Sequence, residues 1–138
     1  MATYNKFQQT VEDLAHGVHN FASDQLTVAL CAAANAPVAT NEVLANLTEI
    51  AYTNLSARNI TTASSSQTTG TYTLVLTDLT LTAGGGAVAA FRYVVIYNNT
   101  PTSPADPLVA WFDRGSELTL GDGESLLLDF EPILFSLT

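Results

Sequence analysis

Three titratable side chains near the start of the sequence have a helical spacing. Glu12, His16 and His19 stand at positions i, i+4 and i+7, which places them on one face if the segment is helical. Imidazole and carboxylate groups arranged in this way can ligate zinc, but the sequence places no fourth ligand beside them. A solvated polar face of an amphipathic helix explains the same spacing, so we expect no metal here.

A second group of such residues lies near the C-terminus. Asp122, Glu124, Asp129 and Glu131 supply the carboxylate oxygens that Ca²⁺ prefers. Their spacing matches no known calcium-binding loop, and polar turns with outward strand faces explain them as well. Whether Asp122, Glu124 and Asp129 bind a cation is left open by the sequence.

Nothing in the sequence indicates nucleophilic catalysis. Serine is common, but there is no Gly-x-Ser-x-Gly elbow, and both histidines lie in one short segment. Gly84–Gly86 precedes a strand pattern and not a helix, so it lacks the amide cradle that binds phosphate. Cys31 is the single cysteine and lies in an apolar run, which predicts a buried, inert thiol. We expect neither enzymatic activity nor a cofactor.

Arg92 is the one charge inside the apolar run 91–97. Burying an arginine in a central strand is costly unless it is paired, and Asp113 or Glu117 are the candidate partners. The alternative is an arginine at a strand edge whose guanidinium stays in water.

The composition indicates a single domain, 1–138, with a charge-poor surface. Of the 138 residues, 47% are apolar and only 12% charged, against roughly 25% charged in ordinary soluble domains. Extensive burial against partners explains this, and a plain low-charge monomer is the alternative. With four Lys and Arg and a net charge of −9, binding to nucleic acid or to an anionic membrane is disfavoured. No secretory signal pattern and no run of about 18 apolar residues occurs, so we expect synthesis in a cytoplasm.

The first 24 residues are predicted to form a helical arm. An a/d pattern predicts a helix over about residues 4–21 with one apolar seam, formed by Phe7, Val11, Leu14, Val18 and Phe21. The seam either packs on the protein's own sheet or meets other copies, and these five residues are the candidate oligomer or capsid interface. A strand is expected over 26–33, and a second short helix near 41–51.

Residues 25–138 otherwise predict a mainly β domain. From Asn59 onward the apolar pattern has period two, with a parity slip at Thr77-Asp78 and an apolar central strand over 91–97. A turn is expected at Arg114-Gly115, a hairpin joining 117–120 to 125–130, and a terminal strand over 133–137. About seven or eight short strands with frequent turns predict an antiparallel β-sandwich or a closed barrel.

Five segments form a distinctive series along the chain: Val11–Phe21, Ala36–Leu44 running into Thr48–Ile50, Ser64–Leu74, Phe91–Asn98 and Trp111–Glu124. In this order they resemble a family of small proteins encoded in the structural gene modules of tailed bacteriophages. The resemblance covers nearly the whole chain, and none of the segments is a catalytic motif.

The resemblance implies a virion structural protein, commonly of the capsid decoration or cement type, with no active site and no cofactor. Its expected partners are the major capsid protein and further copies of itself, as a homotrimer, on the capsid exterior after synthesis in the host cytoplasm. One alternative is a neck, tail or head-fibre subunit. Another is a surface carbohydrate-binding module, with an aromatic stacking platform of Tyr52, Tyr93, Tyr97 and Trp111.

Overall fold

The computed structural model describes residues 2–130 and 134–138, and it is mainly β with antiparallel sheets. The largest sheet has five strands in the order β1 (Thr3–Lys6), β8 (Leu108–Leu118), β7 (Phe91–Asn98), β2 (Leu26–Cys31) and β3 (Asn59–Ile60). A three-stranded sheet has the order β10 (Phe135–Leu137), β5 (Thr71–Leu76) and β4 (Thr62–Thr68), and a two-stranded sheet pairs β6 (Leu79–Thr82) with β9 (Ser125–Leu128). In the described chain no sheet closes on itself, so the barrel alternative is wrong.

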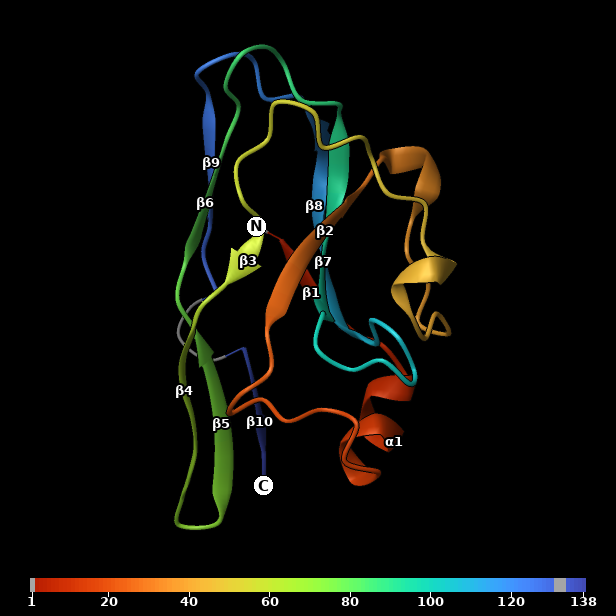
Figure 1. Ribbon diagram of the computed structural model, residues 1–138, viewed down its shortest axis with the longest axis vertical. Coiled ribbons are helices and arrows are strands. Elements are labelled where there is room, and N and C mark those ends of the chain that lie inside the picture. The colour runs from red at the N-terminus through yellow and green to blue at the C-terminus, as the bar shows by residue number, and fades with distance from the viewer. Residues whose placement is uncertain (1, 131–133) are drawn as a thin grey trace.

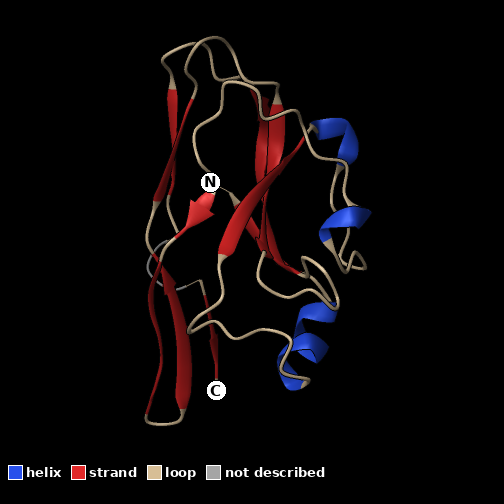
Figure 2. Cartoon of the chain, in the orientation of Figure 1, coloured by secondary structure: helices blue, strands red, loops and turns tan. Residues whose placement is uncertain are grey.

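The helical elements are short. They are α1 (Gln9–Ala15) and two 3₁₀ turns, η1 (Ala33–Asn35) and η2 (Leu44–Asn46). No helix within the described residues has the length and hydropathy needed to cross a membrane. Figures 1 and 2 show these helical elements on one side of the five-stranded sheet and the two smaller sheets on the other.

The central strand β7 is covered on both faces, as its apolar pattern predicts. It pairs with β2 on one side and β8 on the other, and every residue except Arg92 is buried. Because successive side chains of a strand point to opposite faces, β7 contributes to two separate cores. Val94 and Ile96 join the larger core, whereas Val95 and Tyr97 join the smaller one.

The two cores lie on opposite faces of the five-stranded sheet. The larger core joins this sheet to the smaller sheets through residues such as Val28, Leu74 and Leu81. The smaller core packs Phe7 against Trp111, with 4.5 Å between ring centroids, and is bordered by side chains of the 32–50 segment. Segments far apart in the sequence therefore cover each face of one sheet.

The predicted helix over 4–21 is wrong in its extent. Residues 3–6 form β1, which pairs with β8 from Thr3 opposite Asp113 to Lys6 opposite Ala110. The helix is limited to Gln9–Ala15, and Gly17 follows it with φ +72°. Pairing with the edge of β8 satisfies the backbone of the first segment, and the left-handed glycine ends the helix.

The predicted short helix near 41–51 is also wrong. Only Leu44–Asn46 makes a 3₁₀ turn, while Val43 forms an antiparallel bridge with Pro107. The Leu44 N–H donates to Asp106 and the Leu108 N–H donates to Glu42, so this loop borders the sheet. Leu44 and Leu47 still reach the smaller core, which explains their helix-like spacing without a helix.

Two predictions within the C-terminal meander are wrong. Strand β8 continues through Arg114-Gly115 without reversing, and Gly115 with φ +86° lies where the β7–β8 register shifts. The segment 125–130 does not pair with 117–120, because β9 pairs with β6 of the other layer. The start of the predicted terminal strand, residue 133, lies outside the described residues, and β10 occupies Phe135–Leu137.

The parity slip at Thr77-Asp78 separates two sheets. Strand β5 ends at Leu76 and pairs with β4, whereas β6 begins at Leu79 and pairs with β9. Leu76 and Leu81 nevertheless lie in the same core. The predicted break is therefore a crossing between sheets, and both phases of the pattern face the same interior.

Substitutions at Phe7 and Val11 distinguish the observed packing from a continuous helical seam. Phe7 is fully buried and Val11 is 53% exposed. We therefore expect Phe7→Ala to lower the free energy of unfolding by about 3–5 kcal/mol, and Val11→Ala to change it by less than about 0.5 kcal/mol. Urea denaturation followed by circular dichroism measures both, and equal losses would contradict this packing.

Candidate functional site

The structure separates the five residues of the predicted seam. Phe7 precedes α1 and lies in the smaller core, whereas Phe21 follows α1 and lies in the larger one. Leu14 packs at the border of the larger core, Val18 is half-buried and Val11 is exposed. The surface part of the seam is therefore Val11 with the accessible parts of Leu14 and Val18.

The buried face of α1 is polar. The Thr10 hydroxyl points at the carbonyl oxygens of Leu108 and Val109, at 3.0 and 2.9 Å, and thereby attaches α1 to β8. Asp13 is also buried, on the same side of the helix. Docking by polar groups leaves Val11 in solvent, opposite to the amphipathic expectation.

His19 is buried in a polar cluster and is not part of a solvated face. Its Nδ1 lies 3.1 Å from the Asn98 side-chain nitrogen, which also donates to an Asp24 carboxylate oxygen at 2.6 Å. Its Nε2 faces Asp13 at 3.9 Å, too far for a hydrogen bond, and the two side chains are 0% and 5% exposed. The Phe21 ring stacks on the imidazole at 5.0 Å. Glu12 and His16 remain together at the surface, 3.7 Å apart.

Burial disfavours the charged form of His19. Because Asn98 donates toward Nδ1, the neutral tautomer with its proton on Nε2 fits the contacts. Burial lowers the pKa of His19 below its ordinary value of 6.5, and the Asp13 and Asp24 carboxylates oppose that shift. The cluster connects the segment after α1 to the end of β7.

Arg92 pairs with Asp113, one of its two predicted partners. Its Nε and Nη2 donate to the two carboxylate oxygens at 2.8 and 3.0 Å, a bidentate ion pair. The guanidinium lowers the pKa of Asp113, and the Gly115 N–H adds to that shift. Glu117 instead accepts a hydrogen bond from the Ala33 N–H. Both side chains of the pair are about one third exposed, and the pair lies at the register shift between β7 and β8.

The acidic residues near the C-terminus act as turn caps where their contacts are known. Asp122 accepts from the Gly85 N–H at 3.0 Å, and Glu124 accepts from the Gly121 N–H at 2.6 Å. Within residues 2–130 and 134–138, no three His, Cys, Asp or Glu side chains are grouped closely enough to hold a metal. Glu131 lies outside the described residues.

The aromatic platform is divided between core and loop. Trp111, Tyr93 and Tyr97 are at most 8% exposed and belong to the smaller core. Tyr52 is half-buried, with the Arg58 guanidinium 3.7 Å from its ring centroid. These rings stabilise the fold and offer no shared face for stacking a sugar.

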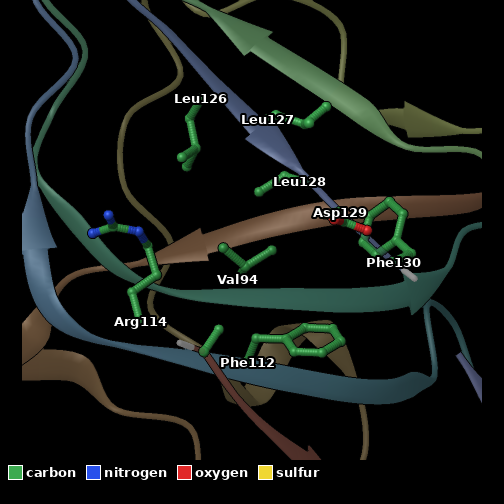
Figure 3. A pocket seen from close by; sticks show the side chains of 9 residues that line it. Val94, Phe112, Arg114, Leu126, Leu127, Leu128, Asp129 and Phe130 are labelled. Carbon is green, nitrogen blue, oxygen red and sulfur yellow. The ribbon is translucent and has the colours of Figure 1, made fainter. Parts of the chain in front are cut away.

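An apolar pocket lies between the two layers. It has a volume of about 410 Å³ and lies between Val94 and Phe112 of the large sheet and residues 126–130, which comprise the end of β9 and the two residues after it. Ala2 and Arg114 also line it. Figure 3 shows Leu126 and Leu128 of β9 on the side of Val94 and Phe112, with Arg114 and Asp129 at opposite ends. No Ser, Cys, His or Lys is among the described lining residues, so the pocket offers apolar contact and no nucleophile.

Sequence reasoning missed both the pocket and the His19 cluster. The pocket depends on the pairing of β9 with β6, and the cluster depends on Asn98 coming beside His19 across the fold. The apolar run 126–128 is the one local sequence feature that hints at the pocket. No local sequence feature indicates the His19 cluster.

The comparisons with known proteins return no relatives. No family model, no curated protein and no solved structure matches this chain.

The buried imidazole predicts a pH dependence of stability. The unfolded chain binds a proton on His19 near pH 6.5, whereas the folded chain resists it, so the free energy of unfolding falls as the pH drops below about 6.5. We expect His19→Phe to remove this slope between pH 7.5 and 5.5 and the exposed control His16→Gln to retain it. Urea titrations at each pH measure the slope, and an unchanged slope in His19→Phe would contradict the assignment.

The Cys31 thiol is predicted to be unreactive in the folded protein. Burial raises its pKa to about 11, and the Glu49 carboxylate adds to the shift. We expect almost no reaction with a chromogenic disulfide reagent at pH 8, and one thiol per chain after unfolding in guanidinium. Stoichiometric labelling of the native protein at the rate of a free thiol would contradict the buried environment.

Proposed function

We propose that this chain is a structural protein of a tailed-bacteriophage virion that binds between major capsid subunits as a cement or decoration protein. The serial resemblance of its segments to small phage structural proteins supports the proposal. We further interpret the fold as a β-sandwich, with the five-stranded sheet as one layer and the two smaller sheets as the other. The protein would be made in the host cytoplasm, bind the capsid exterior and act without catalysis or a cofactor.

The observation that carries the proposal is the charge-poor surface. Only 12% of residues are charged, and Ser, Thr and Asn take their place. Hydroxyl and amide groups lose less on desolvation than full charges do, so such a surface is well suited to burial against a partner. Several large apolar side chains are also exposed: Tyr4, Val11, Val38, Leu127 and Leu137.

The net charge supports a position outside the shell. At −9, with only four Lys and Arg, the chain would be repelled by packaged nucleic acid, and its acidic surface is tolerated on the exterior. The mechanism would be binding alone. A ligand that binds the assembled shell and not its free subunits stabilises the shell by mass action.

The surface part of the seam is the proposed contact on this side of the molecule. Val11, Leu14 and Val18 can meet a capsid subunit or, once the chain is bound to the capsid, other copies of the chain in the proposed homotrimer. Phe7 and Phe21 are buried in the cores, so they can affect that contact only indirectly, by holding the surrounding segment in place.

Binding to capsids tests the proposed function. Purified protein should co-sediment with empty expanded capsids of the phage that encodes it and raise their melting temperature. We expect Val11→Asp to fold normally and to weaken capsid binding by about tenfold or more, while Thr40→Asp, on the adjoining 32–50 loop, serves as a matched surface control.

Other outcomes would reassign the protein. Failure to bind capsids, together with co-purification with tails or necks, would favour the neck, tail or head-fibre alternative. Selective binding on a glycan array without capsid binding would favour a carbohydrate-binding module.

A further inference from the structure

The β4–β5 hairpin projects beyond the rest of the fold. Figure 1 shows it extending at one end past the five-stranded sheet, past β10 and past α1. Leu74 and Leu76 of β5 anchor its base in the larger core. Its tip is a two-residue turn at Thr69-Gly70 with φ +49° and +85°, the left-handed values that match the twist of a tight hairpin. The hairpin is therefore a well-defined projection whose base is packed in the larger core, and residues 59–77 are called the arm below.

The arm carries no charge in an acidic protein. No residue from Asn59 to Thr77 carries a charge, although the chain as a whole has a net charge of −9. Arg58 and Asp78 are the nearest charges on either side, both at the base. Two copies that approach through their arms keep their charged bodies farther apart, so they repel one another less than two that approach through their bodies.

The outer edge of the arm is open. Strand β4 pairs with β5 on one side, and no other described strand pairs with it. Soluble proteins block such edges with Lys, Pro or inward-pointing charges, yet the sequence of β4 is TASSSQT. The single register shift, between Thr62 and Ser64, lies at the base and leaves the remainder regular.

The pairing pattern shows which backbone groups are available. Thr68 and Thr71 close the two-residue turn, and in such a hairpin the closing pair is hydrogen-bonded. Alternation then directs the N–H and C=O groups of Ser65 and Gln67 away from β5, toward the open edge. These groups are a ready template for another strand.

We infer that β4 pairs with β4 of a second copy, antiparallel around a two-fold axis near Ser65. The pairing joins two three-stranded sheets into one six-stranded sheet and places the two acidic bodies at opposite ends of the joined arms. Self-pairing brings only Ser, Thr, Gln and Ala opposite one another, and hydroxyl pairs across strands are favourable. The contact does not depend on a role in a virion.

A proline at Ser65 tests the edge directly. Ser65→Pro removes an N–H that points to the open edge and leaves the β4–β5 ladder intact. Ser65→Ala is the matched control, because it loses the same hydroxyl contact to Tyr72 but keeps the N–H. By sedimentation equilibrium we expect the wild type and Ser65→Ala to dimerise, and the dissociation constant of Ser65→Pro to rise by about tenfold or more.

A charge pair tests the same contact in case the proline variant fails to fold. Ser66 is exposed, and the two-fold axis brings the two copies of this position within reach of long side chains. We expect Ser66→Glu and Ser66→Lys each to be monomeric alone and to form a heterodimer when mixed.

A monomeric wild type, or dimers unaffected by both the proline and the charges, would overturn the inference. A trimer that survives these changes would also overturn it. The capsid experiment has a separate readout, so either idea can fail without the other.

Discussion

The position of β7 between β2 and β8 determines how the rest of the chain must be arranged. Val94 and Ile96 face one side of the sheet and Val95 and Tyr97 the other, so both sides need apolar cover. The chain meets this need with segments distant in sequence. The N-terminal residues and the 32–50 loop cover one face, and the two smaller sheets cover the other. Double coverage makes the N-terminal segment part of the core and not a detachable arm.

The features that could be predicted from the sequence are those that local pattern specifies. The apolar run 91–97 predicts a doubly covered strand, and the period-two pattern from Asn59 onward predicts strands in the region that forms β4 and β5. The parity slip at Thr77-Asp78 predicts a discontinuity, because two faces cannot both be buried against one layer. Arg92 predicts a carboxylate partner for a related reason, since a charge in an apolar strand needs compensation.

The features that could not be predicted depend on which segments meet. Phe7, Leu14 and Phe21 have helical spacing, but β8 offers an open edge to residues 3–6, and pairing with it outweighs helix propensity. Strand β9 follows a glycine-rich turn that suggests a hairpin, yet it pairs with β6, because the face of β7 needs a second layer. The environment of His19 likewise exists only because β7 ends with Asn98 beside the segment after α1. Periodicity identifies apolar residues correctly and cannot say which face buries them.

The distribution of charge separates solubility from contact within one small chain. Thirteen acidic residues against four basic ones keep copies apart in solution. An evenly charged surface would also oppose assembly, because each buried charge must be desolvated and paired. Here the uncharged segment 59–77 occupies a projecting hairpin, so repulsion acts between bodies and spares the arm. A hydroxyl-rich strand edge without charges has a small desolvation cost when it leaves water, and its backbone groups regain hydrogen bonds on pairing. Keeping charge on the body and neutrality on the arm gives an acidic protein a defined direction in which it can associate.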